Sequence, residues 1–253
     1  MSAPVRIVRI LPELLGLNGS LGNAEVLQAR LKWWSVDTQL HDVRAGEDLP
    51  DSADIVVLGS GTSSVVEVAA PEFSRWAKGL HRFKEQGSLW CGIGLGGDLL
   101  GQSVTTAKGE VYQGLGLTPI SARQGGARFS AEVSGKDAKG RPVAGYLNDY
   151  TEREGSGVTS LITLDVTATT QWSGYTSITE EGVLGDGVSQ ENLWVSTLSG
   201  PLLALNPAIA DDILYAWAKR DGTPLPEHTA THQLADFRAE KARQGIVDRL
   251  NTA

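Results

Sequence analysis

The sequence predicts a layered α/β protein built around a mostly parallel sheet. As far as residue 93, short apolar runs alternate with stretches of helical spacing in the order βαββαβ, which is typical of a parallel sheet covered by helices. The 253 residues, 41% of them hydrophobic, suffice to bury one large core. Neither a repeat nor a long linker divides the chain, so we expect one domain over residues 1–253.

Local signals define each element of this first part. The run 55–58 is continuously apolar and ends in glycine, as in a strand that is buried on both faces of a parallel sheet. Pro71 suits the first turn of a helix, and Gly87 suits its end. By the same criteria we expect strands at 5–11, 36–40, 55–58 and 88–93, and helices at 24–34 and 71–86.

The second part of the chain has a different pattern. From Leu117 to Thr197 it consists of short segments rich in Val, Thr and Gly, which predict strands and loops and not crossover helices. Asn206-Pro207 is typical of an N-cap and a first helical position, so we expect a helix from there to about Arg220. A last helix, from about Leu234 to Leu250, has a thin apolar stripe and should pack on the surface of the domain or against a partner.

The charge balance argues against nucleic-acid binding. Lys and Arg number 22 against 30 Asp and Glu, a net charge of -8, whereas broad binding to nucleic acids or anionic membranes needs a basic face. No stretch approaches the roughly 20 apolar residues that span a bilayer, and the apolar run 1–11 is interrupted by a basic residue, unlike a signal peptide. One cysteine excludes an intramolecular disulfide. We therefore expect a cytoplasmic protein without nucleic-acid or membrane partners.

The densest glycine cluster follows the fourth expected strand. Gly92, Gly94 and Gly97 match G-x-G-x-x-G, a pattern whose glycines let the backbone approach a pyrophosphate. However, this fingerprint normally follows the first strand, and Asp98 places a negative charge where phosphate would bind. A dinucleotide-binding module is therefore the weaker interpretation of the cluster.

Thiol and imidazole chemistry is confined to one cysteine and four histidines. Cys91 falls inside a strand, several residues before the turn, which predicts a buried structural cysteine. His228 and His232 have the i, i+4 spacing of zinc ligands, but no third ligand lies close in sequence, so we expect a solvated pair in a loop. We expect His81 on a helix surface and His41 in a loop. The residues predict no metal and no cofactor.

Three segments spread over nearly the whole chain form a recognisable set. The first comprises 10–16, 22–23 and 26–30, and the second has Leu-Leu-Gly at 99–101 followed by 114–117. The third and most specific segment, 199–211, contains Gly-Pro-Leu-Leu, Asn-Pro and Ala-Asp. Together they resemble the GatD-type glutamine amidotransferase subunit of lipid II isoglutaminyl synthase, in the CobB/CobQ class of glutaminases.

The resemblance implies a single-domain, class I glutamine-amidotransferase-like fold with three layers and a central mixed, mostly parallel sheet. It also implies a heterodimer with a MurT-type, Mur-ligase-like partner that amidates peptidoglycan in cell-wall synthesis. In this family the partner activates a glutamate carboxylate of the stem peptide with ATP. The glutaminase supplies ammonia from glutamine through a cysteine thioester and a general-base histidine.

Both catalytic positions of that family are altered in this sequence. Aligning the family's Leu-Leu-Gly with 99–101 places the nucleophile at Gly94, and the histidine that precedes Gly-Pro corresponds to Ser199. Glycine has no nucleophilic atom, and a serine hydroxyl does not accept a proton at neutral pH. The resemblance therefore implies a site without its thioester chemistry.

The resemblance assigns ligand binding to four further residues. Arg128 matches the family's glutamine-contacting arginine, with an ordinary surface arginine as the alternative, and Asn148 matches an asparagine of the middle motif. Gly59 and Gly61 belong to the altered glycine-rich turn near the oxyanion hole.

Three hypotheses follow from these residues. The leading one is a pseudo-glutaminase that scaffolds or regulates a Mur-ligase-like partner and senses glutamine or a small amide through Arg128. The alternative is an active glutaminase that supplies ammonia through Cys91, which would need that thiol exposed near an imidazole. The third is the dinucleotide-binding module.

Overall fold

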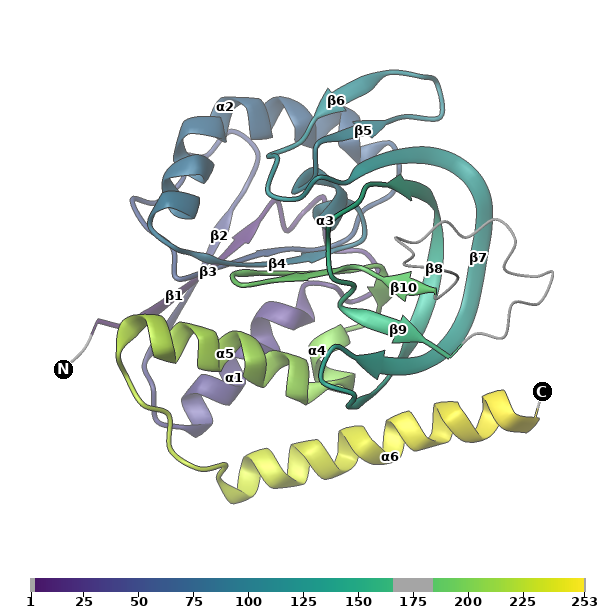
Figure 1. The fold of residues 1–253 in the computed structure, drawn as a ribbon. Coiled ribbons are helices and arrows are strands. Elements are labelled where there is room, and N and C mark those ends of the chain that lie inside the picture. Colours follow the sequence, from purple (N-terminus) through teal and green to yellow (C-terminus); the bar gives the residue numbers. More distant parts are fainter. Residues whose placement is uncertain (1–2, 166–183, 253) are drawn as a thin grey trace.

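A six-stranded mixed sheet forms the centre of the molecule (Figure 1). The computed structural model describes residues 3–165 and 184–252. The strand order is β11-β12-β4-β3-β1-β2, and every neighbouring pair is parallel except β11 with β12. The strands are β1 (Val5–Ile10), β2 (Thr38–Val43), β3 (Ile55–Leu58), β4 (Leu89–Ile93), β11 (Val188–Gln190) and β12 (Leu193–Ser196).

Helices cover both faces of this sheet and produce two hydrophobic cores. One core includes residues of α2 (Val65–Glu85) and α3 (Leu95–Leu99), and the other includes residues of α1 (Gly22–Trp33), α4 (Leu202–Leu205) and α5 (Pro207–Asp221). Successive strand residues point to opposite faces, so in β1 Val8 and Ile10 enter the first core and Val5 and Ile7 the second. The prediction of a three-layer α/β fold with a mostly parallel sheet is confirmed.

The long helix α6 (Ala230–Thr252) packs on the outside of the domain. It contacts α1, α4 and the strands β7 and β8, and it buries only His232, Ala239 and Ile246. This narrow stripe confirms the predicted surface helix, although α6 begins four residues earlier than expected. Among the described helices, none is both long enough and apolar enough to cross a bilayer.

A second sheet curves along one edge of the first (Figure 1). Its strands are β5 (Ser103–Thr105), β6 (Val111–Gln113), β7 (Ser121–Asp137), β8 (Pro142–Glu154), β9 (Ile162–Leu164), β10 (Gly185–Asp186) and β13 (Leu198–Ser199). The antiparallel pair β7–β8 is its dominant feature. The prediction of strands between Leu117 and Thr197 is confirmed for the described residues, and 166–183 lie outside them.

Two boundaries differ from the sequence prediction because of packing. Helix α2 begins at Val65, six residues before Pro71, and the added turns bury Val66 and Ala69 against the core. Packing of this apolar face therefore outweighs the helix-breaking tendency of proline. Strand β2 begins later than expected and extends to Val43, which places His41 within a strand and not in a loop.

Helix α5 begins at Pro207, as predicted, but Asn206 does not cap it with its side chain. Instead the Asn206 amide donates to the Ala144 carbonyl at 2.9 Å and accepts from the Ala144 N–H at 3.1 Å. A third hydrogen bond runs from the same amide to the Leu202 carbonyl at 3.0 Å. Asn206 thus joins the start of α5 to strand β8.

Candidate functional site

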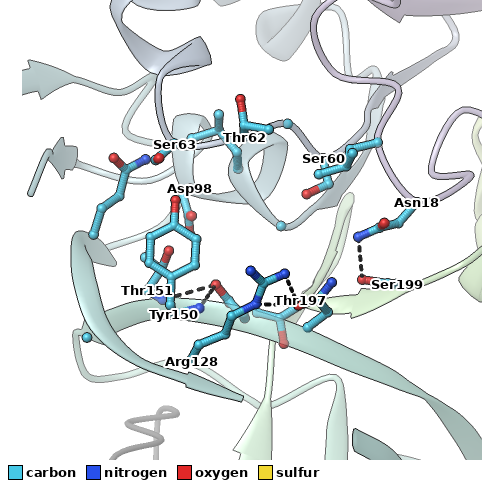
Figure 2. Close-up of a pocket in the computed structure, with 18 residues that line it drawn as sticks. Asn18, Ser60, Thr62, Ser63, Asp98, Arg128, Tyr150, Thr151, Thr197 and Ser199 are labelled. Carbon is cyan, nitrogen blue, oxygen red and sulfur yellow. Dashed lines mark hydrogen bonds between the residues drawn. The ribbon is translucent and has the colours of Figure 1, made fainter. Parts of the chain in front are cut away.

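A cavity of about 500 Å3 opens where the parallel strands β3, β4 and β12 end, and residues of β7 and β8 form its other wall (Figure 2). Ligands of open α/β sheets bind at this edge, because the loops that follow the strands meet there. Five of the predicted site residues line the cavity together: Gly61, Gly94, Arg128, Asn148 and Ser199.

Gly94 forms the turn between β4 and α3. Its φ of 52° and ψ of -123° lie in a region that is costly for any residue with a side chain. Its N–H donates to the Ser196 carbonyl at 2.9 Å, and its own carbonyl accepts from the Asp98 N–H at 3.0 Å. A sharp strand-to-helix turn of this kind displays the nucleophile of hydrolases. Position 94 therefore has the backbone geometry of a nucleophile but no side chain.

The turn after β3 forms the wall next to Gly94. The Ser60 N–H donates to Ser20 Oγ at 2.9 Å, and Ser20 in turn donates to the Leu15 carbonyl at 3.1 Å. Gly61 lines the cavity, whereas Gly59 is buried behind it, where a Cβ would collide with the Leu15 carbonyl. Gly59 therefore lets two backbones approach each other and does not reach the cavity.

Ser199, which was predicted to stand at the general-base position, faces the cavity beside Asn18 (Figure 2). The Asn18 amide donates to Ser199 Oγ at 3.5 Å, and the Gly200 N–H donates to the Asn18 carbonyl at 3.0 Å. Asn18 has a φ of 55°, a left-handed conformation that asparagine tolerates. The hydroxyl of Ser199 can donate and accept hydrogen bonds, but it does not titrate near neutral pH.

Arg128 is directed into the cavity by an irregularity of strand β7. Between Gln124 and Phe129 the pairing with β8 shifts, so that residues 125–128 face Tyr150 alone. Bulges of this kind re-aim side chains next to binding sites. The Arg128 guanidinium donates to Asn148 Oδ1 through Nε at 3.1 Å and Nη2 at 2.9 Å. Arg128 is thus an exposed cation held in one orientation at the cavity wall.

A largely buried ion network joins the strand-to-helix turn at Gly94, here called the elbow, to the β7–β8 wall. Arg153 donates to both carboxylate oxygens of Asp98, at 2.7 and 3.1 Å, and to Asp149 at 2.5 Å. Burial raises the pKa of Asp98, and its pairing with Arg153 opposes this effect. Sequence reasoning missed Arg153 and Asp149, because no local pattern indicates a pairing of residues 55 positions apart.

Cys91 does not belong to the cavity. It is 1% exposed, lies in the middle of β4 and packs in the core on the side of α1 and α5. Burial raises the pKa of its thiol to about 12, so the reactive thiolate is strongly disfavoured. The prediction of a buried structural cysteine is confirmed, and this burial contradicts the alternative in which Cys91 acts as the nucleophile.

The glycines around the elbow are packed against protein atoms. A Cβ on Gly92 would lie 2.8 Å from the Gly97 Cα, and one on Gly96 would collide with the Gly59 carbonyl. These residues allow α3 to approach the sheet closely, and they do not form an open cradle for a pyrophosphate. Asp98, moreover, is paired with Arg153.

The four histidines lie away from the cavity lining. His81 is on the exposed surface of α2, as predicted. His232, expected in a solvated loop, is instead fully buried in α6, where its ring packs 4.3 Å from that of Trp34 and its Nε2 lies 3.1 Å from the Arg30 carbonyl oxygen. His232 is buried because the thin apolar stripe of α6 begins at this histidine.

His228 lies in an ionic cluster and not in the free solvated pair that was predicted. Its Nε2 is 3.3 Å from Asp211, and its Nδ1 is 3.3 Å from Asp236. These three residues have metal-ligand spacing, but the Arg30 guanidinium already donates to both carboxylates at 2.7–2.8 Å. The cluster therefore ties α1 to α5 and α6 through an internal cation.

The cavity can bind but offers little for covalent chemistry. Among the described residues that line it are hydroxyls, amides, carboxylates and one guanidinium, with no thiol and no imidazole. Polar groups of this kind bind a small polar ligand through several hydrogen bonds. A thioester requires a nucleophilic thiolate and a base, which this lining does not supply.

Comparison with known proteins agrees with this geometry. Residues 19–200 match the CobB/CobQ-like glutamine amidotransferase domain. The chain belongs to this family. It is 24% identical over 248 residues to the subunit GatD of lipid II isoglutaminyl synthase (glutamine-hydrolyzing) from Staphylococcus aureus strain N315, covering 97% of this chain and 96% of that subunit.

Solved structures support the same fold. A chain of the PurLQS structure from Thermotoga maritima superposes with a TM-score of 0.51 at 13% identity, covering 86% of this chain and 99% of that one. A glutamine amidotransferase from the same organism has a TM-score of 0.50 at 14% identity, covering 97% and 96%. These similarities confirm a class I glutamine-amidotransferase-like fold.

Proposed function

We propose that this protein is a pseudo-glutaminase: it keeps the glutamine cavity of its family and has lost glutamine hydrolysis. The observation that carries the proposal is the bare elbow at Gly94, a strained backbone turn that displays no side chain. Ser199 at the general-base position and the buried Cys91 leave no described thiol–imidazole pair to substitute. Without both the thiol and the imidazole, the thioester cannot form at all, whereas a milder change would only slow its formation.

We further propose that it acts in lipid II amidation as the non-catalytic subunit of a cytoplasmic heterodimer. Its similarity to GatD extends over 97% of the chain, and the family resemblance implies a MurT-type, Mur-ligase-like partner. In such a complex this subunit scaffolds or regulates the partner, and the partner activates the carboxylate.

The ligand that the cavity suits best is L-glutamine or another small amide with a carboxylate. Arg128, held by Asn148, offers the carboxylate a charge-assisted hydrogen bond. The hydroxyl of Ser60 and the amide of Asn18 are available to the uncharged end. Binding without turnover would let the complex respond to the glutamine concentration.

The nitrogen source of the complex tests this function. The protein is co-expressed with a Mur-ligase-like protein, the complex is purified, and lipid II amidation is followed with ATP and either glutamine or ammonium chloride. We expect co-purification and amidation with ammonium only, while the S. aureus GatD complex accepts glutamine in parallel. Amidation with glutamine would overturn the pseudo-glutaminase, and failure to co-purify would overturn the partnership.

A further inference from the structure

We propose that the Ser60 side chain occupies the space in which the side chain of the missing nucleophile would lie. Ser60 thereby forms the inner end of the ligand cavity. The inference rests on the proposed function, because it assumes that position 94 is the former nucleophile. It adds that positions 60 and 94 cannot both carry a side chain unless one of them moves, which accounts for the loss of activity. It also names Ser60 as the side chain that a ligand contacts at the elbow.

The space beside Gly94 is filled by Ser60. A Cβ placed on Gly94 would lie 2.5 Å from Ser60 Oγ and 3.1 Å from Ser60 Cβ. The optimal separation of two non-bonded carbon atoms is about 3.5–4.0 Å, so a side chain at position 94 would overlap Ser60 as that residue is placed. Both residues line the cavity, and the overlap therefore lies at its wall.

Hydrogen bonds hold the backbones of both Ser60 and Gly94 in place. The Ser60 N–H is held by Ser20 Oγ, and its carbonyl accepts from the Leu17 N–H at 2.9 Å. On the other side the Gly94 N–H is held by the Ser196 carbonyl at 2.9 Å. Rotation of the Ser60 side chain moves Oγ away, but its Cβ remains within 3.1 Å of the added carbon. Only one of the two positions therefore accommodates a side chain without displacement.

A serine at position 60 beside a glycine at position 94 changes how the cavity interacts with its ligand. With Gly94 bare, the Ser60 hydroxyl is the nearest side chain to the empty nucleophile position. A hydroxyl donates one hydrogen bond and accepts two, so it pairs with either end of a primary amide. It is not activated for attack, because the nearby carboxylates Asp98 and Asp149 are paired with Arg153. The expected outcome is reversible binding of the amide.

A double-mutant cycle tests the exclusion directly. Gly94→Ala is made in the native protein and in Ser60→Gly, and thermal unfolding gives Tm for all four proteins. In the native background we expect a fall of about 8 °C, from over-packing together with backbone strain. In the Ser60→Gly background only the strain remains, and the fall should shrink to about 4 °C. Equal falls in both backgrounds would overturn the exclusion.

Gly46→Ala is the matched control. Gly46 also has a positive φ, of 83°, but nothing lies within 4 Å of a Cβ built there. Its substitution should lower Tm by about 4 °C in both backgrounds, because it carries strain alone. Should Gly94→Ala fold only together with Ser60→Gly, the exclusion is likewise supported.

Labelling shows whether the vacated space admits a thiol. Gly94→Cys and the double variant Ser60→Gly/Gly94→Cys are treated with a chloroketone analogue of glutamine, where the thiolate displaces chloride and forms a thioether. Intact mass should show labelling at least tenfold faster in the double variant and none in the native protein, whose Cys91 is buried. Equally fast labelling of the single variant would contradict a blocking role of Ser60.

Binding of L-glutamine to proteins that retain Gly94 gives an independent readout. By calorimetry we expect Ser60→Ala to weaken binding by about 2- to 10-fold, which corresponds to one lost hydrogen bond. Ser64→Ala, in the same loop but outside the cavity lining, should change it less than 2-fold. Unchanged affinity in Ser60→Ala would overturn its role in the cavity. A native protein that binds no glutamine would instead refute the ligand of the proposed function, and the thermal cycle would still decide the exclusion.

Discussion

The two ends of the cavity offer different chemistry. At the elbow end, Gly94 and Ser199 are small and uncharged and supply neither a thiol nor an imidazole. At the binding end, Arg128 is fixed by Asn148 and projects from an irregular strand into the same space. The strained turn at Gly94 displays no side chain. Its own backbone hydrogen bonds hold this turn, independently of the groups at the binding end.

The largest effect should come from breaking the link between the two ends. Arg153→Met leaves Asp98 buried without its cation, and removal of one partner of a buried ion pair costs about 3–5 kcal/mol. Urea unfolding should show this loss. Arg123→Met, an exposed arginine on β7, should stay within about 0.5 kcal/mol. Similar stability of the two variants would mean that the network does not join the two ends.

The binding end should account for most of the ligand affinity. Arg128→Ala removes a charge-assisted hydrogen bond and should raise the Kd for L-glutamine about 10- to 100-fold. Asn148→Ala, which removes the acceptor that orients Arg128, should raise it about 2- to 10-fold. Calorimetry provides the measurement, with Arg123→Ala as the control. An unchanged Kd in Arg128→Ala would mean that Arg128 is an ordinary surface arginine and does not bind the ligand.

The stability of the domain should depend on pH, whereas the ligand affinity of the cavity should not. The buried environment of His232 and the nearby Arg30 charge lower the pKa of His232 to about 4. The unfolded chain, with a histidine pKa of about 6.5, therefore binds the extra proton more readily, and stability should decline as the pH falls from about 6.5 towards 4. Tm against pH in the native protein and in His232→Gln checks this, since the variant should have a shallower slope across that window.

Glutamine affinity, in contrast, should stay constant between pH 6.5 and 8, because no histidine is among the described residues that line the cavity. A bell-shaped or stepped affinity profile in that range would show that a titrating group acts on the ligand.

The smallest effect is expected at the predicted base position, Ser199. Ser199 has one long hydrogen bond, of 3.5 Å, to Asn18. Ser199→Ala should therefore change the free energy of unfolding by less than about 0.5 kcal/mol and the Kd for L-glutamine by less than about 2-fold. A larger rise in Kd would assign Ser199 a direct contact with the ligand.

The sequence was most informative where periodicity dominates. The βαββαβ order as far as residue 93 is correct, because each strand is an apolar run and each helix has a recurrent apolar face. Boundaries were missed where tertiary burial outweighs a local signal, as at Pro71 within α2 and His232 within α6. The irregularity of β7 that aims Arg128 could not be predicted, since it exists only relative to β8.

Among the site residues, those in a family motif were predicted, and those that depend on tertiary contacts were not. The family motif located Gly94 and Ser199, and both line the cavity. The partners that define its electrostatics, Arg153 and Asp149, come from a strand far along the chain and carry no motif. The overlap of Ser60 with position 94 is likewise a property of two turns brought together by parallel strands β3 and β4.

One measurement tests the central claim, that the cavity binds glutamine without hydrolysing it. The protein, alone and with its Mur-ligase-like partner, is incubated with glutamine carrying 15N in the side-chain amide. NMR then reports binding by saturation transfer and turnover by the appearance of 15N-ammonium in the same tube. We predict saturation transfer to glutamine that Arg128→Ala strongly weakens, with no ammonium above a heat-killed sample. Ammonium that grows in proportion to the protein concentration would contradict the claim.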